Sequence, residues 1–435
     1  MTRFTLALAA YVLPAAAVAQ TPPPLSLPQA MQRALRGNPS LARLSHLAGA
    51  ASERVREARA GWMPSVAIVA SATDGPTGAP AFGVTGIAGD PLKKHYGAGV
   101  NVVQTLFDFG RTGHLVAART ALLRAAEQDT ATQTAQVLVA VQEAYLDVLR
   151  RQQLVAVREA VVTQREAAVQ QAQTFVTAGL TADVDLQLAK ADLAEAQGAL
   201  AAARNDVRAG FAALNSVMGD TSLAEYTLSP SPATTAPPSS VESLMDGAVR
   251  NRPELKSAAL QVEAAEQSMR SARSDLLPRF DGIASLGAVN PSKLVLENKD
   301  YAVGLSITAP LYTGGAVEGR IAEERERREA AAALQRETAE AIKLQVARAF
   351  VNVQTREAQL AAARDQASAA RSSQQQAAER YRLQLTSIVE LTAAEAAAAR
   401  AETAAVNAEF DLQTARAELD WATGAILVNA PKAGK

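Results

Sequence analysis

Valine recurs at every seventh position through the middle of the first half of the chain. The series consists of Val141, Val148, Val155, Val162, Val169 and Val176. From about residue 111 to 177, and again from about 316 to 383, no glycine or proline follows the first few residues. A seven-residue apolar repeat is typical of helices that pack side by side as coiled coils. The pattern therefore predicts two very long helices, each on the order of 100 Å at 1.5 Å per residue.

Shorter stretches before each long helix alternate between apolar and smaller or polar residues, as half-buried strands do. The apolar positions are Val66, Ile68, Ala70 and Ala72 in the first half, and Leu305, Ile307, Ala309 and Leu311 in the second. The alternation predicts one β-hairpin at about residues 65–107 and another at about 279–312. Each predicted strand has about 9–11 residues, which is enough to cross a bilayer when the strand is tilted.

The two halves of the chain repeat these features in the same order, which indicates a duplication. Asn38-Pro39 corresponds to Arg252-Pro253, and the strand-to-helix joint at residues 106–110 corresponds to the joint at 310–315. The sequence therefore predicts two helix–hairpin–helix repeats. The expected segments are a first repeat at 20–228, a stiff Pro/Ser linker at 229–240, a second repeat at 241–424 and a C-terminal tail at 425–435.

Each repeat is expected to begin with one helix and to end with a helix that runs back along the long one. Ser26 and Ser239 each precede a Gln or Glu by three residues, the spacing of a capping box, and so mark the starts of the first helices. These helices should end before Pro64 and Pro278. The returning helices are expected at about 183–218 and 388–423. The predicted fold class is mainly α with a small β part.

The N-terminus has the features of an export signal. Arg3 supplies a positive charge, residues 4–19 are apolar, and Ala17-Val18-Ala19 has the small-x-small pattern of a cleavage site. We therefore expect a signal peptide at residues 1–19, with an N-terminal membrane anchor as the alternative. After Gln20 no run of about 18 apolar residues occurs, so no membrane-spanning helix is expected in the mature chain.

The composition excludes several kinds of chemistry. The 435 residues include no cysteine and three histidines, which excludes disulfides, Cys-ligated zinc and a lipid on an N-terminal Cys, and argues against any metal site. The 43 basic and 44 acidic residues nearly balance, which gives no reason to expect nucleic acid as a partner. No nucleophile–base–acid set occurs. We therefore expect no catalytic residues and no cofactor.

Four membrane-length strands per chain are too few to close a barrel. The smallest single-chain barrels have about eight strands, and open strand edges are costly in lipid. Three chains would supply twelve strands and could share one barrel. Their long helices would then continue from the barrel as a cylinder of packed helices.

In this order and in duplicate, the features resemble the TolC-like outer-membrane efflux proteins, or outer membrane factors. The resemblance runs from about Ser26 to Gly424. It implies a homotrimer with a twelve-stranded β-barrel in the outer membrane and a long α-barrel in the periplasm. It also implies a passive exit duct for efflux or type I secretion, which works with a periplasmic adaptor (membrane fusion) protein and an inner-membrane pump. Outer-membrane lipid is a further implied partner.

The resemblance also implies a periplasmic gate where the second pair of long helices turns. Tyr381 and Glu390 match the family's gating tyrosine and the first acid of a constricting ring, and Asp185 matches an aspartate that ties the closed state together. The sequence departs from the family at Thr386, where an arginine is usual, and at Ala393, where a second ring acid is usual. The adaptor is expected to dock at the helix turns formed by Gly179, Leu180, Gln384 and Leu385.

Two other interpretations remain open from the sequence. Glu390 and Asp185 can be solvated acids at helix starts, where the helix dipole favours negative charge. The whole chain can also be a soluble periplasmic coiled-coil adaptor, which would explain the heptads but not the duplicated strand pairs. An outer-membrane location that extends into the periplasm accounts for both the heptad repeats and the duplicated strand pairs.

Overall fold

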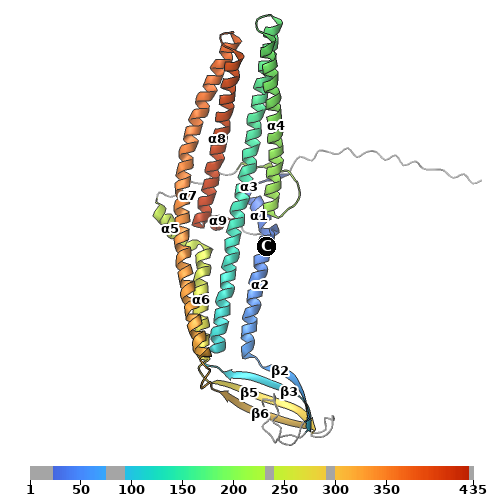
Figure 1. Ribbon diagram of the computed structural model, residues 1–435, viewed down its shortest axis with the longest axis vertical. Helices are drawn as coiled ribbons and strands as arrows, with labels where there is room; N and C mark the ends of the chain where they lie inside the picture. Colours follow the sequence, from blue (N-terminus) through green and yellow to red (C-terminus); the bar gives the residue numbers. More distant parts are fainter. Residues whose placement is uncertain (1–22, 75–93, 231–239, 291–298, 431–435) are drawn as a thin grey trace, which may run out of the picture.

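The computed structural model describes residues 23–74, 94–230, 240–290 and 299–430. The expected signal peptide at 1–19, most of the linker at 229–240 and the end of the tail lie outside these residues. The described chain is long and narrow, with a sheet at one end and the turns of two helical hairpins at the other (Figure 1). The mainly α fold with a small β part that the sequence predicted is confirmed.

The elements follow the same order in both repeats. The first repeat contains β1 (Pro24–Leu25), α1 (Leu27–Gly37), α2 (Pro39–Arg59), a short 3-10 turn (Ala60–Trp62), β2 (Ser65–Asp74), β3 (Lys94–Phe107), α3 (Arg111–Thr177), α4 (Asp183–Met218) and β4 (Thr227–Leu228). The second contains α5 (Val241–Asn251), α6 (Pro253–Ser274), β5 (Arg279–Asn290), β6 (Lys299–Thr308), α7 (Ala316–Arg382) and α8 (Ile388–Thr423), and α9 (Ala425–Val428) follows it. Among the described residues, no helix is both long enough and apolar enough to cross a membrane.

The long helices of the two repeats match in length. Helices α3 and α7 each have 67 residues, and α4 and α8 each have 36. Helix α3 starts at Arg111 and α7 at Ala316, and the returning helices start the same 205 positions apart, at Asp183 and Ile388. The long and returning helices predicted from the sequence are therefore confirmed. From α3 onward, each residue of the first repeat has its counterpart 205 positions later.

The single helix expected before each hairpin is instead two helices, because the chain bends at the residue before a proline. Asn38 (ψ 119°) and Arg252 (ψ 127°) are extended, which is the conformation that a following proline favours. The Asn38 amide donates to the Val217 carbonyl at 2.8 Å, and the Arg252 guanidinium donates to the Ala422 carbonyl at 3.2 Å. Each bend is thus attached to the end of the returning helix of its own repeat.

The four long strands form one antiparallel sheet in the order β2-β3-β5-β6. The register aligns Val66, Val102, Ala284 and Val303 across one face, and this face is apolar and largely exposed. The opposite face carries smaller and polar residues, which include Asn101, Ser285 and Ser306. Strands β2 and β6 each pair with only one described strand, so the sheet has two free edges.

The largest buried cluster lies near the middle of the long axis, where α1, α3, α4 and the short β1–β4 pair meet. Tyr145 of α3 is fully buried there, and its hydroxyl lies 2.9 Å from the Leu25 carbonyl and 2.6 Å from the Ser229 carbonyl. The heptad valines Val141 and Val148 are also fully buried in this cluster. Toward the hairpin turns the heptad valines are only partly buried, which leaves surface for further packing.

Candidate functional site

The candidate site lies at the end away from the sheet, where α3 turns into α4 and α7 turns into α8 (Figure 1). Gly179 and its counterpart Gln384 both adopt the left-handed backbone conformation there, with φ of 69° and 58°. This conformation costs a non-glycine residue about 1–2 kcal/mol. The next residues, Leu180 and Leu385, are exposed. Each turn therefore carries a solvent-exposed leucine side chain at the end of the molecule.

Tyr381 lies in a buried cluster that joins the two hairpins next to these turns. It is 3 % exposed, and its ring lies edge-on to Phe175 of α3 with 5.7 Å between the ring centroids. All four long helices contribute to the cluster, through Ala168, Ala172, Leu186, Ala189, Ala377, Tyr381, Ile388 and Leu391.

The hydroxyl of Tyr381 makes no hydrogen bond with any described residue, although it is buried. Burial raises the pKa of this hydroxyl, and the negative charge of Asp185 raises it further, so the group stays neutral. The contact that joins the hairpins is therefore made by the aromatic ring and its apolar neighbours.

Glu390 stands in the first turn of α8 and is paired within its own chain. Arg380 Nη1 lies 3.1 Å from Glu390 Oε1, and the Thr386 hydroxyl donates to Oε2. The two charged side chains are 55 % and 51 % exposed, and exposed pairs contribute only about 0–1 kcal/mol. An arginine thus stands beside the acid even though Thr386 replaces the arginine that the family resemblance leads one to expect. Arg382 pairs with Glu379 instead, at 2.8 Å.

Asp185 occupies the counterpart position of Glu390, in the first turn of α4, and is half-buried. Its backbone N–H donates to the Ala182 carbonyl at 3.1 Å. Its charge acts on Tyr381, as described above. The structure therefore brings the expected gate residues together as two sets, Asp185 with Tyr381 and Glu390 with Thr386.

Sequence reasoning missed a buried ion cluster near the same end. Arg165 Nη1 of α3 lies 2.7 Å from Glu395 Oε2 of α8 and 3.5 Å from Asp192 Oδ2 of α4. Burial raises the pKa of Glu395, while the positive charge of Arg165 opposes that rise and Asp192 adds to it. One signal was available in the sequence, because Glu395 is the lone charged residue in the alanine-rich stretch 393–399.

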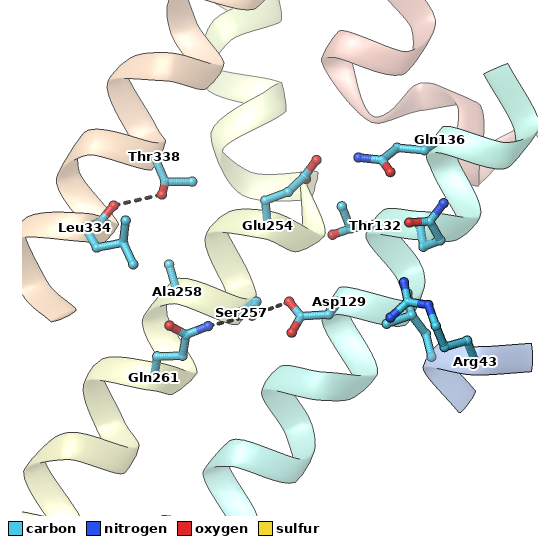
Figure 2. A pocket seen from close by; sticks show the side chains of 12 residues that line it. Arg43, Asp129, Thr132, Gln136, Glu254, Ser257, Ala258, Gln261, Leu334 and Thr338 are labelled. Atoms are coloured by element: carbon cyan, nitrogen blue, oxygen red, sulfur yellow. Dashed lines mark hydrogen bonds between the residues drawn. The ribbon is translucent and has the colours of Figure 1, made fainter. Parts of the chain in front are cut away.

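A polar groove of about 340 Å³ lies closer to the sheet, between α2, α3, α6 and α7 (Figure 2). In this groove Ser257 donates to Asp129 at 2.7 Å, and Gln261 donates to Ser257 at 3.3 Å. Serine next to aspartate without a histidine or lysine base is not an activated nucleophile. Throughout the described part of the chain, no three His, Asp or Glu side chains are grouped as metal ligands would be.

The fold, with its paired hairpin turns, is shared with solved structures of outer-membrane channels. The sequence matches the family described as outer membrane efflux protein over residues 30–220 and 244–425, which is most of the chain. The protein therefore belongs to this family, and the resemblance read from the sequence is confirmed. Like its relatives, it is a protein of the outer membrane that extends into the periplasm.

Two curated relatives are similar over part of their length. Outer membrane efflux protein BepC of Brucella suis biovar 1 is 25 % identical over 276 residues, which are 63 % of this chain and 58 % of BepC. Outer membrane protein TolC of Escherichia coli K12 is 25 % identical over 311 residues, which are 68 % of this chain and 61 % of TolC. The match thus spans less than two thirds of either relative.

Solved structures share the whole architecture at low identity. The outer-membrane channel OprN superimposes with a TM-score of 0.78 at 23 % identity and covers 92 % of this chain and 89 % of its own. The outer membrane protein VceC of Vibrio cholerae gives 0.76 at 22 % identity, with 92 % and 96 % covered. At this identity the likeness establishes the fold alone.

Proposed function

We propose that three copies of this chain form a passive duct through the outer membrane, by which substrates leave the cell. The observation that carries this proposal is the sheet, which has one apolar, exposed face and two free edges. Each unpaired backbone group at an edge in lipid costs several kcal/mol. Pairing β2 of one chain with β6 of the next removes the edges, and three chains close a barrel of twelve strands.

The helices continue this barrel into the periplasm. Helix α3 contacts α2 and α6 in the half near the sheet, and α4 and α8 in the half near the turns, so that these helices form a wall (Figure 1). Three such walls complete a cylinder. The polar groove of Figure 2 is a part of this wall that water can wet.

The hairpin turns form the closed periplasmic end of the duct. Tyr381 and the apolar cluster around it hold the two hairpins of a chain together there, with Asp185 nearby, and Glu390 lines the mouth. Three Glu390 side chains around one axis attract cations. Because Arg380 and Thr386 already bind Glu390, the ring is weaker than three unpaired carboxylates would be.

The periplasmic adaptor and the inner-membrane pump act at the same end of the duct, where the hairpin turns lie. Exposed apolar side chains at the turns, namely Leu180, Val184, Leu385 and Val389, offer a docking surface for a periplasmic adaptor. An inner-membrane pump supplies the energy for transport, as the family resemblance implies. The alternative of a soluble coiled-coil adaptor leaves the apolar sheet face and its free edges unexplained.

Conductance in planar bilayers tests the proposal. The protein purified in detergent should be trimeric and should give discrete conductance steps. Glu390→Ala should widen the conductance or weaken block by cations, whereas Glu379→Ala, a matched loss of one negative charge from an exposed ion pair at the same turn, should change neither. A monomer that stays in solution without detergent and never forms channels would contradict the duct and favour the soluble adaptor.

A further inference from the structure

The polar groove of Figure 2 lies on one side of four neighbouring helices. Helices α2, α3, α6 and α7 pack side by side in this order, and each of them contributes side chains to the lining. The groove volume of about 340 Å³ is at the lower end of the range of about 300–1,000 Å³ that is usual for ligand pockets. The groove is therefore large enough for a small organic molecule.

The groove opens toward the bore of the proposed duct. On α3 the lining residue Gln136 and the core residue Leu138 are two positions apart, which places them about 200° apart around the helix. Leu138 and Tyr145 pack against α1 and the β1–β4 pair in the buried cluster near the middle of the long axis. Three copies of these elements inside a ring of helices would fill the bore. In the duct they therefore lie outside the ring, and Gln136 faces inward.

Uncharged amide and hydroxyl groups make up most of the polar lining. Gln133, Gln136 and Gln261 each carry an amide, which donates and accepts hydrogen bonds as a peptide group does. The residues that line the groove include no aromatic side chain, so they offer no stacking surface to a flat apolar molecule. The lining therefore favours a ligand that is itself rich in polar groups.

The groove also offers one charge of each sign. Arg43 of α2 and Asp129 of α3 are both exposed, and neither forms an ion pair with a described residue. Asp129 accepts the Ser257 hydroxyl through Oδ1 at 2.7 Å, which leaves Oδ2 without a hydrogen bond to the described part of the chain. Glu254, by contrast, is already bound through both oxygens by the Arg252 guanidinium. A ligand with both charges can therefore pair with Arg43 and Asp129 at once.

The other repeat lacks this combination at the equivalent places. The counterpart of Asp129, 205 positions later, is Leu334. The counterpart of Gln261, 214 positions earlier, is Leu47, since 214 positions also separate the two proline bends. The corresponding stretch of wall between two chains is thus apolar where the groove is polar. The polar set occurs once in each chain, which indicates a specific site rather than a general wetting of the wall.

We propose that each groove is a weak binding site for short zwitterionic peptides that pass through the duct. The carboxylate of the peptide pairs with Arg43 and its ammonium group pairs with Asp129, while the glutamine amides bond to the peptide groups between them. The groove is open to water, so binding is weak enough to release the peptide, as passage through a channel requires. This inference rests on the trimeric duct proposed above and names the class of its cargo.

Block of the current in planar bilayers tests the site, with trialanine as the probe. Trialanine should interrupt the current of the natural trimer, and N-acetyl-trialanine amide, which lacks both terminal charges, should do so at higher concentration. Arg43→Gln and Asp129→Asn should each raise the half-blocking concentration of trialanine about fivefold, because an exposed ion pair contributes at most about 1 kcal/mol. Neither change should affect block by the capped peptide.

Arg54→Gln is the matched control for Arg43→Gln. Arg54 is also an exposed arginine of α2, but it lies about three turns nearer the sheet and does not line the groove. Its loss should leave the half-blocking concentration unchanged. Equal effects of Arg54→Gln and Arg43→Gln would mean that the charge acts through the bore as a whole, which would overturn the site.

A second variant tests the amides without changing any charge. Gln136→Ala together with Gln261→Leu introduces the residues of the equivalent places in the other repeat, Ala341 and Leu47, so the fold should tolerate it. This double variant should weaken block by both peptides.

Three results would overturn the peptide site in a trimer that conducts. These are absence of block by trialanine, block that is equal in all variants, and block by maltotriose at lower concentration than by trialanine, which would make a sugar the better ligand. Absence of any channel in the natural protein would instead refute the duct itself.

Discussion

Replacing Tyr381 with alanine and with phenylalanine separates the contribution of its ring from that of its hydroxyl. The ring is 3 % exposed and touches side chains from both hairpins. The hydroxyl is buried and has no partner among the described residues. The two substitutions should therefore act in different directions on the closed end of the duct.

The typical free-energy costs of such substitutions give the size of the effect of each variant on the closed state. Truncating a buried aromatic residue to alanine costs about 3–5 kcal/mol, part of which is the edge-on contact with Phe175. If about half of this is lost when the hairpins separate, Tyr381→Ala weakens the closed state by about 2 kcal/mol and raises the open-to-closed ratio about 30-fold. An unpaired buried hydroxyl costs about 1–3 kcal/mol. Tyr381→Phe should therefore leave the closed state unchanged or more stable.

Open probability of the purified trimer in planar bilayers measures both effects. Tyr381→Ala should conduct more often than the natural protein, and Tyr381→Phe should not. Phe175→Ala removes the facing ring and should act like Tyr381→Ala, while the amount of trimer on a native gel controls for assembly. If Tyr381→Phe opened the duct as much as Tyr381→Ala, the reasoning would be refuted, because the hydroxyl would then have to hold the closed state through a bond such as one to Asp185.

Three further predictions concern single side chains. Arg380→Ala should strengthen block by divalent cations because Glu390 loses its partner, and an unchanged blocking concentration would show that Glu390 does not line the mouth. Gln384→Gly should slow amide exchange at the turn about fivefold by relieving about 1 kcal/mol of left-handed strain, whereas Gln384→Ala should not, and equal rates would mean that the turn is unstrained. Burial raises the pKa of the Glu143 carboxyl above its ordinary value, and the charge of Glu418 raises it further. Folding therefore favours the protonated form, so the stability linked to this carboxyl is present below the ordinary glutamate pKa and is lost as pH rises through the raised pKa of the folded protein. Glu143→Gln should flatten the fall of the melting temperature between about pH 4 and 7, and an unchanged slope would contradict this.

The long elements were predictable because their signals are local and repeated. Absence of glycine and proline defined α3 and α7, and alternation located both hairpins within a few residues of the observed strands. The break between α1 and α2 at Asn38 was missed as a helix end, although the proline that causes it was visible. The first helix of the second repeat is capped by Ser240, whereas the capping-box spacing predicts Ser239.

The candidate site was predictable only in part, since it depends on contacts between distant segments. The positions of Tyr381, Asp185 and Glu390 came from the family resemblance, because no local pattern distinguishes an acid at a gate from an acid at an ordinary helix start. The partner of Glu390 was not decidable from the sequence, where Arg380 and Arg382 both precede it, at 10 and 8 positions. The pairing of Arg165 with Glu395 joins residues 230 positions apart and leaves no periodic trace.

The most direct test of the trimeric duct is cross-linking in the cell, followed by detergent extraction and identification of the attached proteins by mass spectrometry. The account predicts a trimer of this 45.4 kDa chain, somewhat lighter if the N-terminal segment is removed, joined to a periplasmic adaptor and an inner-membrane pump. A monomer that needs no detergent and carries no membrane partner would contradict it.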